Sequence, residues 1–430
     1  MIPPLIFCPH FKLLPSTGLC YLPLLYKGIR LFMPTEELKQ DAARFVMQTY
    51  TRQPLSIVRG RGTKVYDLEG REYLDFVGGI AVNVLGHGHP DLVHAIQHQA
   101  AQLIHTSNLY YTEPQVKLAQ MLVEHSFADK VFFCNGGAEA NEAAIKLTRR
   151  YSHDKYGAGR FEIITMKNSF HGRTMATLTA TGQDKVQKGY EPLLPGFSYV
   201  AFNNFAELER AVTDKTAAIM LEPIQGEGGV YAADRQYVKQ VRDLCTHKDV
   251  LLIFDEVQTG MGRTGTLFAY EQLGVHPDIM TLAKALGGGV PIGACLATDS
   301  VAKAFSPGSH ASTFGGNPLA CAAGLAVCRA LLEDHVLDHA RRMGEYFAKG
   351  LSDCKARHRV VREVRGVGLL QGMELEMDAK AVVSECLARG ILINATGEHV
   401  LRFVPPLIIT QLEIDRLLDT LAQIFSAQAS

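Results

Sequence analysis

The chain has 430 residues, enough for one large domain and one smaller one. Hydrophobic residues make up 47% and charged residues 20%, as in an ordinary globular protein. The 43 Lys and Arg residues balance 44 Asp and Glu residues, so no basic excess indicates a nucleic-acid-binding protein. Nine cysteines without regular spacing predict reduced, buried thiols in a cytoplasmic protein.

The first 32 residues differ in composition from the rest. They contain five prolines and no acidic residue, and acidic residues begin at Glu36, after Met33-Pro34. The prolines interrupt the apolar stretch too often for a membrane helix, and neither a signal peptide nor a transit peptide fits. We expect residues 1–32 to be an extension outside the fold, with no membrane partner, and the domain to start near Met33.

From about residue 60, short apolar runs alternate with helix-length segments. We predict a helix over residues 139–151, because Ala140, Ala143, Ala144 and Leu147 recur at helical spacing. Strands are expected at 130–134, 161–166, 217–221, 250–254, 278–282 and 293–297. This alternation is typical of an α/β fold with a mostly parallel sheet covered on both faces.

The C-terminal part has a different pattern. One helix is expected over residues 321–351, followed by strands around 361–375, 391–393 and 400–404. The last helix should begin with a capping box formed by Thr410 and Glu413. We therefore predict a large domain over residues 86–325 and a smaller α+β domain over 326–430, to which the N-terminal segment 33–85 contributes.

Two residues that could together bind one cofactor, an aspartate and a lysine, follow expected strands of the sheet. Asp255 lies directly after the strand expected at 250–254, and Lys284 follows the strand expected at 278–282. Because ligands bind at the carboxyl ends of parallel strands, both side chains should lie at the same edge. A carboxylate for a pyridinium nitrogen and a lysine for a Schiff base are the groups that pyridoxal phosphate requires.

Further strand-end motifs could complete such a site. Gly136 and Gly137 join a strand to a helix, a turn that suits a phosphate. Phe170 could stack on a flat ring, and Arg173 could bind a carboxylate. By itself, each of these residues is at least as well explained by ordinary packing or turn geometry.

Three more segments carry candidate residues. Glu227 lies in a glycine-rich loop, and Gln258 follows Asp255 by three residues, where it could bond a ring hydroxyl. Ser312-Thr-Phe-Gly-Gly-Asn-Pro offers hydroxyls and free N–H groups for a phosphate. The histidines of Gly86-His-Gly-His-Pro lack a further ligand at suitable spacing, so we expect a turn there and no metal site.

Over residues 35–425 the sequence resembles the class III (ornithine/4-aminobutyrate type) pyridoxal-phosphate aminotransferases of fold type I. The resemblance is most specific in Asp255-Glu-Val-Gln-Thr-Gly-Met-Gly-Arg-Thr-Gly and in Lys284-Ala-Leu-Gly-Gly-Gly. It implies a large domain with a mostly parallel seven-stranded sheet, a smaller α+β domain, and a homodimer. Residues 1–32 have no counterpart in the family.

The resemblance also implies roles for individual residues. Lys284 and Asp255 would be catalytic, Lys284 as the covalent carrier of the cofactor and Asp255 as the partner of its ring nitrogen. Further cofactor contacts would be Gly137, Ala138, Phe170, Glu256, Val257 and Gln258, with Thr313 acting from the partner subunit. Substrate contacts would be Arg173, Glu227, Ser312 and Arg402, and Glu227 would release Arg402 when a dicarboxylate arrives.

Within the family, the sequence is most similar to the branch that acts on N-acetylornithine. This implies transfer of the terminal amino group of N2-acetyl-L-ornithine to 2-oxoglutarate, a step of arginine biosynthesis. Related transaminases acting on succinylornithine, ornithine, 4-aminobutyrate or succinyl-diaminopimelate remain alternatives, because pocket shape decides among them. Less favoured alternatives are an aminomutase and a non-enzymatic cofactor-binding protein.

Overall fold

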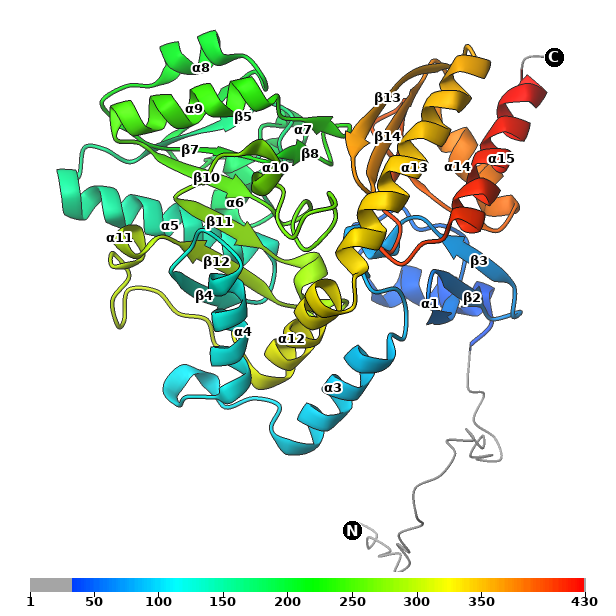
Figure 1. Cartoon of the computed structure of the whole chain (residues 1–430), viewed down its shortest axis with the longest axis horizontal. Helices are drawn as coiled ribbons and strands as arrows, with labels where there is room; N and C mark the ends of the chain where they lie inside the picture. Colours follow the sequence, from blue (N-terminus) through cyan, green and yellow to red (C-terminus); the bar gives the residue numbers. More distant parts are fainter. Residues whose placement is uncertain (1–32, 429–430) are drawn as a thin grey trace, which may run out of the picture. The chain divides into compact units, whose positions relative to one another are not determined.

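The largest sheet joins strands that are far apart in the chain (Figure 1). The computed structural model describes residues 33–428. Within them, this sheet has seven strands in the order β4 (Lys130–Cys134), β12 (Gly293–Ala297), β11 (Ile279–Leu282), β10 (Leu251–Asp255), β7 (Thr216–Leu221), β5 (Glu162–Met166) and β6 (Phe197–Val200). Strand β12 is antiparallel to both neighbours, and all other pairs are parallel. The predicted mostly parallel seven-stranded sheet is confirmed.

Both faces of this sheet are covered. Along β10, Leu251 and Ile253 belong to one buried cluster, which also contains alanines of α5 (Gly137–Tyr156). The alternating residues Leu252 and Phe254 belong to a second cluster, which includes residues of α9 (Arg235–Lys248). Side chains of successive strand residues point to opposite faces, so a strand buried on both sides has a continuous apolar sequence.

Two expectations about this part of the chain need correction. Strand β6 was missed, because this edge strand is only partly buried and has no continuous apolar run. The single helix expected over 321–351 is two helices, α12 (Pro318–Glu333) and α13 (Val336–Arg357). His335 between them has a φ of 58°, a left-handed conformation that ends the helical hydrogen bonding.

Two smaller sheets contain the C-terminal strands. One has the order β1 (Ile57–Arg61), β2 (Lys64–Asp67), β3 (Glu72–Asp75) and β15 (Ile391–Leu392). The other has the order β13 (Val361–Val367), β14 (Leu370–Leu375), β17 (Val400–Phe403) and β16 (Asn394–Thr396). Because β3 and β15 pair, residues 57–75 share a sheet with Ile391–Leu392 of the C-terminal part. The exact domain boundaries remain predictions.

The remaining elements connect and cover these sheets. They are α2 (Gly78–Ala81), α3 (Pro90–Gln102), η1 (Ser107–Leu109), α4 (Glu113–Glu124), α6 (Met175–Ala180), α7 (Asp184–Gln187), α8 (Phe205–Ala211), β8 (Ile224–Gln225), β9 (Tyr231–Ala232), α10 (Tyr270–Leu273), η2 (Lys284–Gly287), α11 (Asp299–Ala302), α14 (Ala379–Ala388) and α15 (Gln411–Gln428). The capping box before α15 is confirmed, since the Thr410 backbone N–H donates to Glu413 (2.9 Å) and the Glu413 backbone N–H donates to the Thr410 hydroxyl (3.4 Å).

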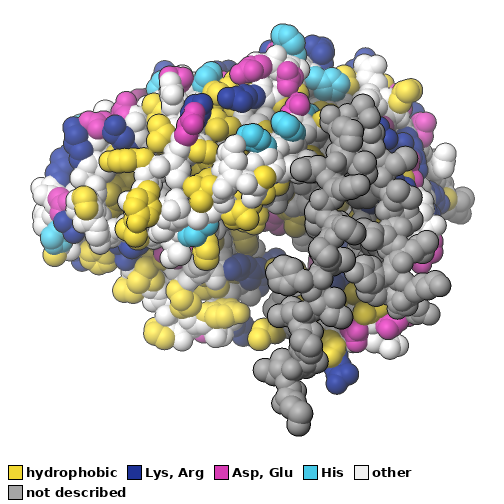
Figure 2. Space-filling model, turned by 90° about the horizontal axis from the view of Figure 1, so that it is seen from below, with side chains coloured by type: hydrophobic (Ala, Val, Ile, Leu, Met, Phe, Trp, Pro, Cys, Tyr) yellow, Lys and Arg dark blue, Asp and Glu magenta, His cyan; other side chains and the backbone are white. Residues whose placement is uncertain are grey.

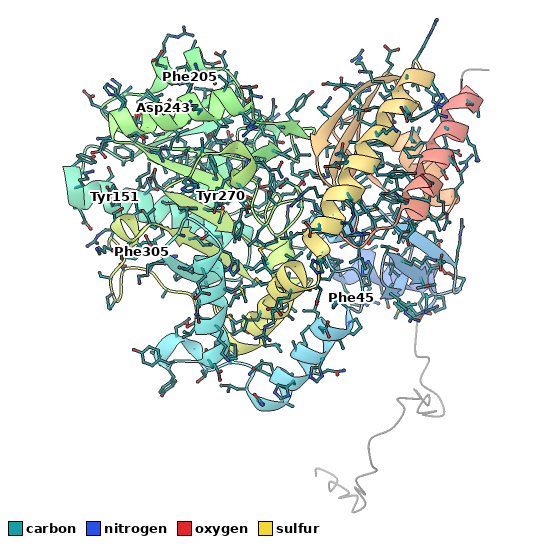
Figure 3. All side chains as sticks on the ribbon, in the orientation of Figure 1. Phe45, Tyr151, Phe205, Asp243, Tyr270 and Phe305 are labelled. Atoms are coloured by element: carbon teal, nitrogen blue, oxygen red, sulfur yellow. The ribbon has the colours of Figure 1, made fainter. Side chains whose placement is uncertain are left out.

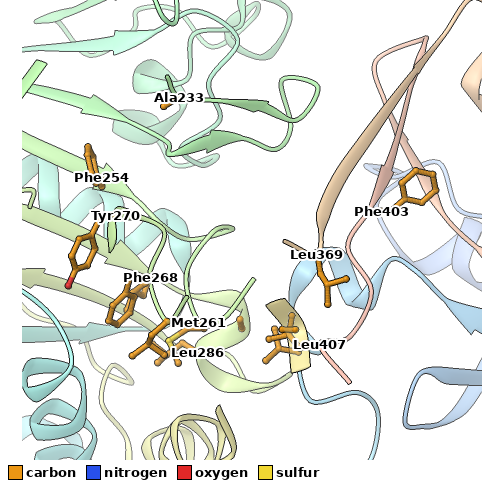
Figure 4. Close-up of a cluster of buried hydrophobic side chains, with 14 of the residues drawn as sticks. Ala233, Phe254, Met261, Phe268, Tyr270, Leu286, Leu369, Phe403 and Leu407 are labelled. Carbon is orange, nitrogen blue, oxygen red and sulfur yellow. The ribbon is translucent and has the colours of Figure 1, made fainter. Parts of the chain in front are cut away.

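The hydrophobic core continues from the large sheet to the C-terminal strands. Figure 4 shows Phe254 of β10, then Met261 and Phe268 of the following loop, and then Leu369 and Leu407 of the C-terminal part. Tyr270, which is labelled in Figure 3, packs edge-on against Phe127 with ring centroids 5.5 Å apart. This shared core fixes the loop after Asp255 between the two parts of the fold.

The first compact unit of the chain ends at Ser56. Its described part contains α1 (Thr35–Phe45), which begins with Glu36 and Glu37 in its first turn, where acidic side chains favour a helix. The extension expected at residues 1–32 lies outside the described residues. No helix in residues 33–428 combines the length and apolar composition needed to cross a membrane.

Candidate active site

A cavity of about 460 Å³ opens at the carboxyl end of β10. Strands β10 and β11, the first turn of α5 and the loops after β5, β7 and β8 meet there. Its lining includes most residues expected from the sequence to form the site, namely Gly137, Ala138, Phe170, Arg173, Glu227, Asp255, Val257, Gln258 and Lys284. The fold therefore brings together segments that are up to 147 residues apart, from Gly137 to Lys284.

Asp255 is the last residue of β10 and is only 4% exposed. One carboxylate oxygen, Oδ1, accepts the Val257 backbone N–H (3.0 Å). The other, Oδ2, accepts from the Asn141 amide (2.7 Å) and lies 2.8 Å from His171 Nδ1. These contacts fix the orientation of the carboxylate, which suits a group that must pair with a ring nitrogen.

Lys284 begins the short helix η2, immediately after β11. Its φ of 46° is a strained conformation for a residue with a side chain, and such strain is concentrated at functional sites. Burial lowers the pKa of the Lys284 amine, and the positive charge of Arg402 acts in the same direction, although Glu227 and Asp255 oppose it. The lowered pKa increases the fraction of neutral amine, the form that can act as nucleophile or base.

The start of α5 provides a place for a phosphate. Gly137 and Ala138 are the first residues of this 20-residue helix, and both line the cavity. Gly137 has no room for a side chain, because an added Cβ would lie 2.7 Å from Val257 Cγ1. Free backbone N–H groups and the helix dipole favour an anion at this end.

Phe170 and Arg173 lie on the loop after β5, and both line the cavity. The Arg173 guanidinium is exposed and lies 5.5 Å from the centre of the Phe170 ring. The Phe170 backbone N–H donates to Glu222 Oε2 (3.1 Å), which fixes the loop at the end of β7. An aromatic face and an available guanidinium could thus bind a flat ring and a carboxylate.

Glu227 and Arg402 form an ion pair, with 2.5 Å between the Glu227 Oε1 and Arg402 Nη1 atoms. Arg402 is 2% exposed and also donates to Gln258 Oε1 (3.4 Å), whereas Glu227, 31% exposed, lines the cavity. Burial alone would raise the pKa of Glu227, but the charge and hydrogen bond of Arg402 reverse the effect and lower it. Glu227 is therefore ionised and covers a buried cation.

Comparisons with known proteins agree with this arrangement. The sequence model of the family Aminotransferase class-III matches residues 45–425. The chain belongs to the class-III aminotransferase family. The acetylornithine aminotransferase of Caldanaerobacter subterraneus subsp. tengcongensis is 57% identical over 384 residues, which span 89% of this chain and 98% of the relative.

Solved structures of the family agree as well. The N-acetylornithine aminotransferase of Stenotrophomonas maltophilia K279a is similar with a TM-score of 0.78 and 41% identity, covering 91% of this chain and 99% of that one. An ornithine aminotransferase of Toxoplasma gondii, with partial occupancy of PLP at its active site, has a TM-score of 0.88 and 35% identity, covering 91% and 94%. The aminotransferase fold and class predicted from the sequence are confirmed.

Four expected site residues of this class-III aminotransferase do not line the cavity of the single chain, namely Glu256, Ser312, Thr313 and Arg402, the last of which is paired with Glu227. Glu256 points elsewhere, because its carboxylate accepts the backbone N–H groups of Ala269 (2.7 Å) and Tyr270 (2.8 Å). Burial raises its pKa to about 7. Ser312 and Thr313 border a separate hollow beside Asn135. The expected roles of Glu256, Ser312 and Thr313 remain predictions.

The structure adds three aminotransferase residues that the sequence analysis did not assign. Asn141 and His171 contact Asp255, and Glu222 lines the cavity. Burial and the nearby charge of Asp255 raise the pKa of Glu222 well above its ordinary value. A sequence signal existed for Asn141, a polar residue among buried alanines on the sheet-facing side of α5. Nothing comparable distinguishes His171 or Glu222.

Proposed function

We propose that this chain uses pyridoxal 5'-phosphate and that Lys284 is its covalent attachment point. The proposal is supported by the donor set of the cavity: a fixed carboxylate at Asp255, an amine at Lys284, an aromatic face at Phe170 and a helix N-terminus at Gly137. Class-III aminotransferases depend on this cofactor. When bound, it supplies an electron-accepting ring and a carbonyl carbon that takes up and returns the amino group.

In this proposal the residues of the chain divide the chemistry between them. Asp255 holds a proton on the ring nitrogen, and Asn141 and His171 keep its carboxylate oriented. With the cofactor bound, the neutral Lys284 amine would remove a proton from the substrate carbon that bears the amino group and would return it to the cofactor carbon that takes up that group. Arg173 binds the carboxylate that both substrates share, and Gln258 bonds the ring hydroxyl.

We infer that the two substrates are N2-acetyl-L-ornithine and 2-oxoglutarate, giving N-acetyl-L-glutamate 5-semialdehyde and L-glutamate. The observation that carries this inference is the Glu227–Arg402 pair beside the cavity, hereafter called the gate. N-acetylornithine has one carboxylate, which Arg173 can bind, so it needs no second arginine. Glutamate and 2-oxoglutarate have two carboxylates, and a second arginine is needed to bind the second one. An ion pair that opens only when a substrate carboxylate replaces Glu227 allows one site to bind both kinds of substrate. The relative from Caldanaerobacter supports the choice of amino donor.

A donor screen tests the substrate assignment. With 2-oxoglutarate as acceptor, we expect the highest kcat/KM for N-acetylornithine among N-acetylornithine, N-succinylornithine, ornithine, 4-aminobutyrate and N-succinyl-diaminopimelate. Glutamate formation is the measurement. A higher kcat/KM for another donor would reassign the substrate. Turnover without any keto acid would instead indicate an aminomutase.

Substitution of Glu227 tests the gate. In Glu227→Ala the Arg402 guanidinium is permanently available, so glutamate should compete better against N-acetylornithine. We expect the ratio of the two half-reaction rate constants to shift toward glutamate by about tenfold, which corresponds to about 1.4 kcal/mol. Arg402→Ala should shift the ratio in the opposite direction, and Arg173→Ala should weaken both half-reactions. Cofactor absorbance after mixing with each amino donor measures the rates. An unchanged ratio in Glu227→Ala would eliminate the gate.

We further propose that the aminotransferase is a homodimer. Support comes from exposed apolar side chains on and around η1 and α4, namely Leu103, Ile104, Leu109, Tyr110, Tyr111, Val116 and Phe314. Figure 2 shows hydrophobic side chains gathered on this lower face. The Asn108 amide donates to the Ser312 carbonyl (3.1 Å), so the patch borders Thr313. A second copy placed here could receive Thr313 at its own phosphate site, and light scattering measures the oligomer.

A cytoplasmic location belongs to the same proposal. The cysteines of the described residues are unpaired and buried, as expected in a reducing compartment. Cell fractionation tests it.

A further inference from the structure

Glu227 lies on a loop, residues 226–230, whose own sequence does not make it rigid. The loop joins β8 to β9 and contains Gly226, Gly228 and Gly229. Its one internal backbone tie is the hydrogen bond from the Val230 N–H to the Gln225 carbonyl (2.9 Å). Glycine-rich segments have many accessible conformations, so the position of this loop must be set by its surroundings.

One side of the loop is packed against residues of the large sheet's loops. A Cβ on Gly226 would lie 1.8 Å from Gln258 Oε1, and a Cβ on Gly228 would lie 2.6 Å from the Asn168 carbonyl oxygen. At the end of the loop, Val230 is fully buried in a small cluster with Leu370 of β14 and Val404, and so it packs against the C-terminal part. These contacts limit how far the backbone can move toward the cavity.

On the other side, two arginines of one C-terminal sheet bind the loop on either side of Glu227. Arg402 of β17 donates to the Gly226 carbonyl (3.2 Å) and to Glu227. Arg365 of β13 donates through Nε to the Gly229 carbonyl (2.9 Å). Strands β13 and β17 both pair with β14, so the two guanidinium groups extend from one rigid sheet.

Arg365 is itself held firmly. Its side chain is 9% exposed, and Nη1 donates to Glu363 and Glu374, each at 2.7 Å. The guanidinium also lies 3.9 Å from the centre of the Tyr231 ring, on the strand that follows the loop. A planar guanidinium can make all these contacts at once, which a lysine ammonium cannot. Arg365 takes no part in the proposed chemistry, yet it ties the loop to the sheet that carries Arg402.

We propose that Arg365 is a positioning residue that determines substrate specificity by holding the Glu227 loop in register with Arg402. With Gly229 fixed, Glu227 leaves and rejoins Arg402 by side-chain rotation, while the backbone stays in place. Without this tie the loop gains conformational freedom, Glu227 covers Arg402 for a smaller fraction of the time, and dicarboxylates bind more readily. This inference rests on the proposed gate and extends it.

The test compares Arg365→Lys with Arg362→Lys. In Arg365→Lys the new side chain keeps a positive charge near Glu374 but loses the Nε donor to Gly229. Arg362 is the matched control, because it lies on the same strand and its Nη1 is 3.5 Å from Glu374 Oε1, but its side chain is 59% exposed. Arg365→Gln provides a second variant, whose side chain is uncharged and shorter than that of arginine.

For the Arg365→Lys holoenzyme we expect the ratio of the glutamate to N-acetylornithine half-reaction rate constants to rise about three- to tenfold. Its Kd for glutarate, a dicarboxylate without an amino group, should fall by a similar factor in calorimetric titration. Arg362→Lys should leave both quantities unchanged. In Glu227→Ala, adding Arg365→Lys should cause no further shift, because the group that it positions is gone.

Each outcome decides between two interpretations. If Glu227→Ala shifts the ratio and Arg365→Lys shifts neither the ratio nor the glutarate Kd beyond Arg362→Lys, then Arg365 is an ordinary structural ion-pair residue. An equal loss of both half-reactions would lead to the same conclusion. If Glu227→Ala itself has no effect, the gate fails, and the inference about Arg365 fails with it for that separate reason.

Discussion

Lys284→Ala is expected to abolish steady-state transamination while the protein stays folded. The cavity places this amine beside Asp255, Glu227 and Gln258, and the proposed chemistry assigns both covalent attachment and proton transfer to it. Loss of a residue with two such roles should reduce turnover by at least about 10⁴-fold. Glutamate formation measures turnover, and thermal unfolding with bound cofactor measures folding.

The Lys284→Ala variant also distinguishes covalent attachment of the cofactor from its non-covalent binding. Lys284→Ala should still bind pyridoxal phosphate through Asp255, Phe170 and the start of α5, but borohydride should no longer fix it to the protein. Lys303→Ala serves as control, since Lys303 is 73% exposed and pairs with Asp299, away from the cavity. Borohydride labelling of a different lysine in the native enzyme would overturn the assignment.

Asp255→Asn is expected to lower kcat by about 10²- to 10³-fold with a much smaller change in KM. A neutral amide cannot hold a proton on the ring nitrogen, so the loss arises when the ring takes up electrons, not when the substrate binds. The kcat and KM values from steady-state kinetics separate the two effects. An unchanged kcat would contradict the role of the carboxylate.

This substitution should also lower thermal stability modestly. Asp255 Oδ1 accepts the Val257 N–H, so an asparagine would direct its NH₂ toward the donors Asn141 Nδ2 and His171 Nδ1. Two donors facing each other in a buried site cost about 1–3 kcal/mol. Asp299→Asn, at the half-exposed start of α11, is the control for loss of a carboxylate whose partner is a solvent-exposed lysine outside the site.

Strand and helix identity in the large sheet could be predicted from the sequence because burial on both faces leaves a continuous apolar run. Six strands of the large sheet, β4, β5, β7, β10, β11 and β12, were expected within one residue of their observed bounds. Edge strand β6 and the break at His335 were missed because partial burial and a single left-handed residue leave no periodic signal.

The sequence by itself determined which chemistry the chain carries. Two expected parallel strands that end in a carboxylate and a lysine predicted that Asp255 and Lys284 lie at one sheet edge, and the cavity contains both. The local motif around Gly137 likewise indicated an anion site, because its backbone geometry is set within a few residues.

Only the tertiary structure decided which side chains support those groups. His171 and Asn141 reach Asp255 from different segments, Glu256 turns away toward Ala269, and Arg365 reaches Gly229 from a strand 136 residues later. Such contacts depend on how separate elements pack and on which face each side chain points to. Periodicity and local spacing contain no information about contacts across that distance, so the supporting shell of the site becomes visible only once the chain is folded.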